Sequence, residues 1–414
     1  MTRRVLLAGL AALAMAGCGG GGGEPEEPRE DPGLSREAQQ AIDELDANAR
    51  PHDAADDIEQ LLRERATALE AEDILALEAT ATGRQRAGDR RSARRGKQLL
   101  IERIRYAVDD LQIDGAAATA RVGMSYRVRG MPRPFVTPRK LTLRRESVGW
   151  RVAADKPAGE PLPWEIAAFR ATRTPHVVLL TPPGVGAGAL RRGLERAYRD
   201  IRRDLPGRAL PRRVLVVATA GAPMTEQLSG RLARGVVAIA NVSVAYRPGP
   251  ARQVGRVLAQ RMIVVHDRWR RLPPAERQST LVHEMTHTAL DPDTSGRTPA
   301  WLAEGVAMYV SGDDRTAEAA ARAGGLGPAM KLDQVSRPGS IFRLSGRAQG
   351  AAYAAASGAA YAIVAHAGTK GLFRLYDAFN DRRFRGRPGA ALTDRVLRRS
   401  VGMSLDELDA LVAG

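Results

Sequence analysis

The 414-residue chain contains a single cysteine, which excludes a disulfide framework and any cysteine-rich zinc module. Aromatic residues make up only 4% of the sequence, so we expect a core built mainly from Ala, Val, Leu and Ile. No apolar run reaches the roughly 20 residues that a membrane-spanning helix needs, which excludes a multi-pass membrane protein. The length itself is typical of two or three domains.

Lysine is also scarce, because only five of the 63 basic residues are lysines although the net charge is +16. The arginines are spread through all regions and are not gathered on one helix between aromatic residues, as a nucleic-acid-binding surface would require. Alanine and glycine are abundant as well, and this combination is typical of a high-GC coding bias. We therefore expect no nucleic-acid partner.

The first residues have the features of a secretory leader. Two arginines precede the twelve-residue apolar stretch Val5–Ala16, and small residues lead to the only cysteine, Cys18. Ala-Met-Ala-Gly-Cys resembles the lipobox of bacterial lipoproteins, except that Met15 stands where that family usually has leucine. The resemblance implies removal of residues 1–17, lipidation of Cys18, a flexible linker over 18–33, and a position on the extracellular face of the cell membrane. A plain secretion signal with an incidental cysteine is the alternative.

Residues 34–155 predict helices followed by antiparallel strands. Leu and Ile recur at three- and four-residue steps over 34–82, whereas the polar, Arg-rich stretch 83–96 is expected to be a loop, and alternation over 111–155 indicates strands. Helices followed by a curved sheet that ends in Gly-Trp-Arg-Val resemble a nuclear transport factor two-like module. That resemblance implies an accessory unit for binding or packing, with no chemistry of its own. The three-proline segment 156–164 is expected to be a linker.

Short apolar strands precede helices in residues 165–414, which predicts an α+β domain. The expected strands cover 176–180, 214–218, 236–244 and 262–266, and the expected helices cover 190–204, 274–290, 299–310, 353–367, 372–379 and 405–412. Ser404 and Glu407 form the capping-box pattern that begins the last helix.

His283-Glu284-x-x-His287 lies within the expected helix 274–290. Four residues advance a helix by about 400°, so both histidines lie on one face and can bind one zinc ion. Glu284 is rotated by about 100° from His283 and is free to take a proton from a water held at the open coordination position. Two surface histidines on a solvated helix are the alternative, but the neighbouring residues are uncharged.

A catalytic zinc ion takes three protein ligands and one water. Glu304, seventeen residues after His287 in Pro-Ala-Trp-Leu-Ala-Glu-Gly, is the candidate third ligand on the following helix. The two motifs together resemble the gluzincin metallopeptidases, most closely the peptidase MA-like group. This resemblance implies a zincin-like domain over 165–414, zinc held by His283, His287 and Glu304, and peptide-bond hydrolysis with Glu284 as general base and acid.

The same family places a tyrosine on a later helix, where its hydroxyl stabilises the oxyanion. The resemblance implies that Tyr353, fifteen residues before Gly368, takes this role, with Tyr361 as the reserve. The alternative is that both tyrosines only pack. Asp291, four residues after the second histidine, is a candidate for orienting a ligand imidazole.

No intact exopeptidase motif is present, so the sequence favours an endopeptidase that acts on a peptide or protein. An extended substrate could pair with an apolar edge strand of the sheet. The alternative is a catalytically inactive, peptidase-like lipoprotein that holds zinc or binds a partner.

Overall fold

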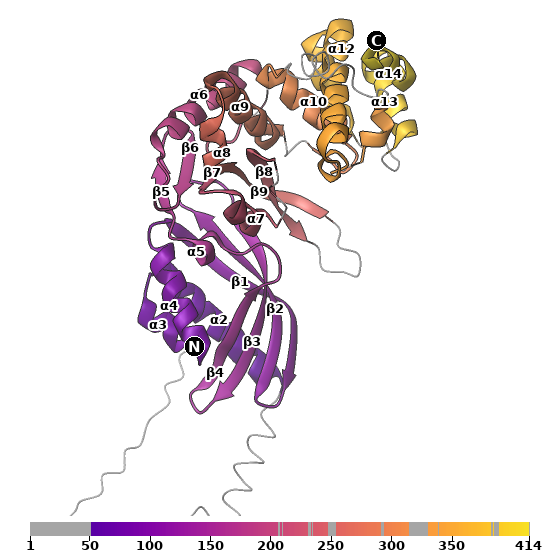
Figure 1. Ribbon diagram of the computed structural model, residues 1–414. Coiled ribbons are helices and arrows are strands. Elements are labelled where there is room, and N and C mark those ends of the chain that lie inside the picture. The colour runs from indigo at the N-terminus through magenta and orange to yellow at the C-terminus, as the bar shows by residue number, and fades with distance from the viewer. Residues whose placement is uncertain are drawn as a thin grey trace, which may run out of the picture. The chain divides into compact units, whose positions relative to one another are not determined.

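The computed structural model describes residues 51–205, 208, 210–230, 233, 235–246, 254–290, 294–313, 330–337, 339–381, 384 and 389–413. All of them belong to the compact unit Pro51–Gly414, which is separate from Met1–Arg50. Cys18 and the expected leader therefore lie outside the described residues. The described part is mixed helix and sheet, as the sequence predicts (Figure 1). None of its helices is both long and apolar enough to cross a membrane.

Three helices and an antiparallel sheet form the N-terminal part of the described chain. The helices are α2 (Pro51–Glu70), α3 (Ile74–Ala79) and α4 (Arg84–Gly96). The strands, which pair in sequence order, are β1 (Ile101–Asp114), β2 (Ala117–Val128), β3 (Phe135–Glu146) and β4 (Gly149–Pro157). Every second residue of β2 is buried, as the two-residue period of a strand requires.

A second sheet follows, with five strands in the order β5-β6-β7-β9-β8. The strands are β5 (Arg170–Arg173), β6 (Val177–Thr181), β7 (Val214–Thr219), β8 (Ala238–Tyr246) and β9 (Val254–Val265). The three central strands are parallel, whereas β5 and β8 pair antiparallel with their neighbours at the two edges. One long edge of the sheet is therefore formed by β8.

Helices accompany and follow this sheet. They are α5 (Pro163–Ile166), α6 (Gly188–Asp204), α7 (Ala222–Ser229), α8 (His266–Arg271), α9 (Pro274–Leu290), α10 (Ala300–Ser311), α12 (Gly346–Ala378), α13 (Ala390–Val401) and α14 (Leu405–Ala413), with short 3₁₀ turns at Leu332–Val335 and Ile341–Arg343. The backbone of Gly368 has a φ of 70°, so α12 is two helical segments that meet at this glycine. Helix α13 is not among the expected helices. The capping box forms as predicted, with the Glu407 amide donating to Ser404 Oγ at 3.1 Å.

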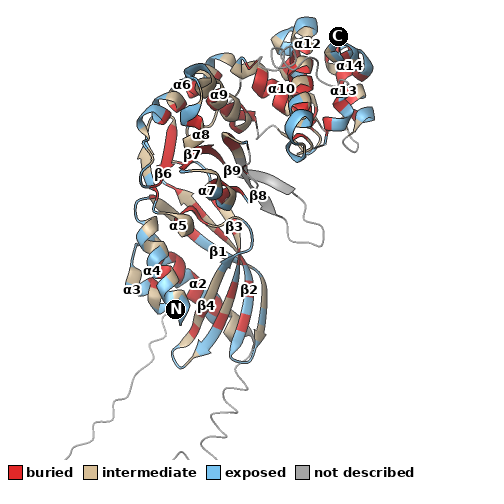
Figure 2. Ribbon diagram, viewed as in Figure 1, coloured by how far each residue is buried: buried red, intermediate tan, exposed pale blue. Residues whose placement is uncertain are grey.

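The two faces of the five-stranded sheet are covered by different parts of the chain (Figure 2). On β7, Val214 and Val216 pack in one apolar cluster with α6 and α9. Their neighbours Leu215 and Val217 pack in another cluster with the N-terminal sheet, whose Phe135 is 3% exposed. Burial on both faces explains why the central strands are continuous apolar runs. The N-terminal sheet and the five-stranded sheet thus share one core.

Residues 83–96 are not a loop, because Arg84–Gly96 forms helix α4. The acidic residue in this Arg-rich segment, Asp89, is 3% exposed and accepts two hydrogen bonds of 2.6 Å from Arg65 of α2. The local composition does not indicate this helix, which is stabilised by an ion pair between α4 and α2.

The expected linker, residues 156–164, contributes side chains to the core. Leu162 and Trp164 are each 4% exposed and lie in the cluster that the two sheets share. The Trp164 ring contacts the edge of Tyr126 with ring centroids 5.0 Å apart. The prolines restrict the backbone dihedral angles of this segment, and its two large apolar side chains are buried in the core.

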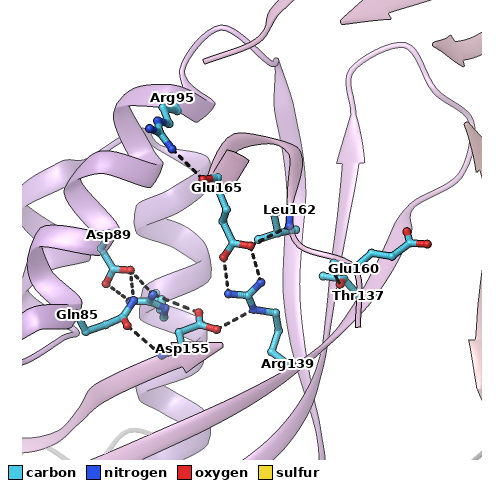
Figure 3. Close-up of polar contacts among 10 residues, drawn as sticks. Gln85, Asp89, Arg95, Thr137, Arg139, Asp155, Glu160, Leu162 and Glu165 are labelled. Carbon is cyan, nitrogen blue, oxygen red and sulfur yellow. Dashed lines mark hydrogen bonds and ion pairs between the residues drawn. The ribbon is translucent and has the colours of Figure 1, made fainter. Parts of the chain in front are cut away.

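Five charged side chains from five different elements form a network that is buried except at Glu165 (Figure 3). Arg65 bonds to Asp89 and contacts Asp155 at 3.4 Å, and Arg139 donates to Asp155 at 2.7 Å. Arg139 also makes two parallel hydrogen bonds to Glu165 of α5, at 2.5 and 3.1 Å. The network lines a cavity of about 560 Å³, and each of its carboxylates is bonded to at least one of the two arginines. It therefore connects α2, α4 and α5 to β3 and β4.

Candidate metal centre

Helix α9 places both histidines of the sequence motif on one side. Leu281 and Met285 are fully buried in the cluster with α6 and the five-stranded sheet. The side chains of His283 and His287 remain 14% and 15% exposed. Since the apolar side fixes the rotation of the helix, both imidazoles are directed towards Glu304 of α10.

Three side-chain atoms form a nearly equilateral triangle. The Nε2 atoms of His283 and His287 are 3.2 Å apart. Glu304 Oε2 lies 3.3 Å from the first and 3.4 Å from the second. A tetrahedral ion with bonds of about 2.0–2.1 Å separates neighbouring ligand atoms by about 3.3–3.4 Å. The three donors therefore have the spacing of a zinc ligand set, and among the described residues they are the one such group.

Glu304 is 5% exposed and contacts both imidazoles. Burial alone would raise the pKa of this carboxyl group, but the charge and hydrogen bonds of His287 and His283 lower its pKa well below the usual range. The carboxylate therefore stays ionised, which is the form that binds a divalent cation. Two imidazoles and one carboxylate suit zinc, and such a set leaves one coordination position for water.

Gly305, the next residue, lets α10 approach α12 closely. A Cβ atom at this position would overlap the carbonyl oxygen of Ala356 and lie 3.2 Å from the Cβ of Ala360. This glycine is therefore required by the closeness of two helices and not by its backbone angles. The close approach brings the α12 residue Tyr353 near Glu304.

Gly305→Ala is expected to destabilise the protein by about 1–3 kcal/mol, the usual cost of overpacking a core. It should also weaken zinc binding, because α10 must move away from α12 and carries Glu304 with it. Thermal unfolding and zinc titration measure the two effects. Gly350→Ala on α12 is the matched control, since nothing lies within 4 Å of its added Cβ. Unchanged stability and zinc affinity in Gly305→Ala would contradict the packing role.

Glu284 lies beside the triangle and is not part of it. Its Oε2 accepts a hydrogen bond of 2.6 Å from the backbone amide of Ala240 on β8. Because β8 pairs with β9 on its other side, this amide belongs to the free edge of the sheet. Glu284 is thus held at a strand edge, directly after the candidate ligand His283 on α9.

Of the two candidate tyrosines, Tyr353 is the one near the carboxylates. Burial raises the pKa of Tyr353, and the charges of Glu304 and Glu284 raise it further. The hydroxyl therefore stays protonated and can act as a hydrogen-bond donor. Tyr361 is 38% exposed, and its ring contacts the edge of Tyr309 with centroids 5.3 Å apart.

Asp291, the candidate for orienting a histidine, lies outside the described residues. Two features of the site are not among the sequence predictions: the Ala240 amide and the close approach at Gly305. The first has no side-chain signal, because any residue except proline supplies an amide. The second has a weak signal, a glycine directly after the predicted ligand.

No protein-family model matches the chain, and no curated protein matches it. Among solved structures, an M1 zinc metallopeptidase variant from Deinococcus radiodurans is 15% identical to this chain, with a TM-score of 0.34. The matched region covers 72% of this chain and 62% of the metallopeptidase chain. This chain therefore spans less than two thirds of that protein. A Mycobacterium tuberculosis protein of unknown function is 18% identical over 26% of this chain and 76% of its own, with a TM-score of 0.22. A ketosteroid isomerase-like protein from Catenulispora acidiphila is 18% identical over 23% of this chain and 82% of its own, with a TM-score of 0.18.

Proposed function

We propose that the chain is a zinc-dependent peptidase. The observation that supports this most directly is the triangle of His283, His287 and Glu304, whose edges of 3.2–3.4 Å match the ligand spacing of a tetrahedral zinc ion. A site that only holds metal needs no further carboxylate, yet Glu284 lies beside the triangle on the same helix. A partly buried, protonated Tyr353 close to both carboxylates completes the set that peptide hydrolysis requires.

His283, His287 and Glu304 would hold the ion, which when bound polarises a carbonyl group and lowers the pKa of a water molecule to about 7. Glu284 accepts a proton from the attacking water. Tyr353 donates a hydrogen bond to the oxygen that gains negative charge as the carbonyl carbon becomes tetrahedral. Glu284 then gives its proton to the amide nitrogen as the C–N bond breaks, so that one water is consumed and an acid and an amine are released.

The edge strand β8 supports an extended peptide as the substrate. The Ala240 amide on its free side already reaches Glu284, so a peptide paired along this edge would pass the proton-moving group. Pairing with a strand edge uses backbone hydrogen bonds and is tolerant of sequence. We therefore favour an endopeptidase, carried on the extracellular face of the membrane by a lipid on Cys18.

The purified protein is expected to bind one zinc ion per chain and to cleave members of an unbiased peptide library. His283→Ala removes one of three ligands and should lower zinc affinity by more than about 100-fold, above the range seen when only a supporting group is lost. Metal analysis and mass spectrometry of the digested library measure the two effects. His366→Ala is the control, since that ring bonds to the carbonyl of Val401.

The two measurements separate the competing functions. Bound zinc without any cleaved peptide would favour the inactive, zinc-holding alternative. Absence of zinc binding in the folded wild-type protein would contradict both.

A further inference from the structure

Helix α6 has one buried face and one arginine-rich face. Its buried residues follow the three- and four-residue steps of an amphipathic helix: Leu190, Leu194, Ala197, Tyr198 and Ile201. All six of its arginines are exposed: Arg191, Arg192, Arg196, Arg199, Arg202 and Arg203. Helix α6 therefore gathers six arginines on one face, but without exposed aromatic residues between them. Thirteen residues from the first to the last arginine span about 18 Å.

Most of this positive charge is not neutralised within the described part of the chain. Arg203 pairs with Asp204 at 2.8 Å and approaches Asp200 at 3.7 Å. No ion pair to a described carboxylate is found for the other five arginines. A row of exposed, uncompensated guanidinium groups favours binding to a surface that carries many negative charges.

Glu195 lies among these arginines, but its carboxylate is already bonded to the segment before β6. It accepts hydrogen bonds from the hydroxyl of Thr174 and from the backbone amide of His176 at 3.0 Å, and it lies 2.8 Å from His176 Nδ1. Glu195 is therefore turned towards the residues before β6. Its neighbours on α6 keep their charge available to an external anion.

The arginine face is also hollowed. Arg191, Arg192, Arg196 and Arg199 line a depression of about 340 Å³ together with Thr174, Pro175 and Glu195. The carboxylate of Glu195 is already bonded to Thr174 and His176. Guanidinium groups pair with phosphate oxygens through two parallel hydrogen bonds, so several arginines around one hollow suit a phosphate group. The aromatic residue of α6, Tyr198, is 5% exposed and is not available to stack on a nucleic-acid base.

We propose that the arginine face of α6 binds the phosphate groups of an anionic lipid surface. The arginines extend along the whole length of α6. Several of them can therefore contact headgroups of a flat lipid surface at the same time. The leader predicted around Cys18 would keep the chain next to such a surface, and α6 would then set the orientation of the protein on it. This inference is independent of peptidase activity.

The test uses the full chain with Cys18→Ser, which cannot be acylated, and measures sedimentation with vesicles. Vesicles of equal parts phosphatidylglycerol and phosphatidylcholine present the anionic surface, and phosphatidylcholine alone reports binding through the apolar leader. The test variant combines Arg191→Gln, Arg192→Gln, Arg196→Gln and Arg199→Gln. The matched control removes the same charge from four exposed arginines on other elements: Arg84→Gln, Arg144→Gln, Arg343→Gln and Arg347→Gln.

The anionic vesicles should bind the parent chain far better than neutral ones, and added salt should weaken this binding. The α6 variant should lose at least about tenfold in partition coefficient, since each basic residue near an anionic membrane contributes severalfold. The control should stay within about twofold, because its charges lie elsewhere. Circular dichroism melting confirms that both variants are folded.

Equal loss in the α6 variant and the control would overturn the proposal, because net charge alone would then explain binding. Equal binding to neutral and anionic vesicles would also overturn it. Displacement from the vesicles by millimolar inorganic phosphate would identify a free phosphate as the ligand instead. Tighter α6-dependent binding to duplex DNA than to anionic vesicles would identify nucleic acid.

Discussion

Glu284→Gln is expected to lower turnover by about 10²–10⁴-fold while zinc content stays at the wild-type level, as loss of a general base and acid does. Glutamine cannot accept the proton of the attacking water or return it to the leaving amine. Its side-chain oxygen still accepts the hydrogen bond from the Ala240 amide, so the geometry around the site is preserved. Single-turnover cleavage of a library-derived peptide, with metal analysis of the same sample, measures both quantities.

Glu276→Gln is the matched control for this experiment. It makes the same chemical change on the same helix, two turns before Glu284, in the first turn of α9. Its turnover should match the wild-type value. If Glu284→Gln cleaved peptide at the wild-type rate, another group would have to move the proton.

Arg139→Met is expected to lower the free energy of unfolding by about 3–5 kcal/mol, the usual effect of removing one partner from a buried ion pair. The arginine side chain is 1% exposed and bonds to Asp155 and Glu165. Methionine fills much of the same volume, but it leaves the buried Asp155 and the partly buried Glu165 with fewer partners. Urea-induced unfolding followed by circular dichroism measures the change.

Arg121→Met on the neighbouring strand β2 provides the comparison. Arg121 pairs with Asp110 at 3.0 Å, but the two side chains are 69% and 40% exposed. Exposed pairs contribute little because water screens both charges, so this variant should unfold close to the wild-type denaturant concentration. An equal loss of stability in the two variants would show that the ion pairs of Arg139 stabilise the fold no more than an exposed pair does.

The sequence predicts the grouping of His283, His287 and Glu304 because most of it depends on local geometry. Helix α9 runs from Pro274 to Leu290, the range that its apolar period indicates. Once that helix forms, the four-residue spacing alone places His283 and His287 together. Glu304 depends on a second helix, yet the uncharged residues around it already indicate a buried element.

The features that the sequence does not predict all depend on contacts between distant segments. Helix α4 is too rich in arginine to show an apolar period, and its Asp89–Arg65 pair joins residues 24 positions apart. The parallel pairing of β7 with β9 skips β8 and has no local pattern. The contact of the Ala240 amide has no signal in side-chain type, and the close approach at Gly305 is marked only by the glycine itself.

The five-stranded sheet takes part in two cores, one with α6 and α9 and one with the N-terminal sheet. A chain that began at β5 would expose Leu215, Val217 and their neighbours to water, although every residue of the metal triangle would still be present. The N-terminal segment therefore covers one apolar face of the five-stranded sheet. Any exchange of residues 51–155 must therefore also supply an apolar surface that matches Leu215, Val217 and their neighbours.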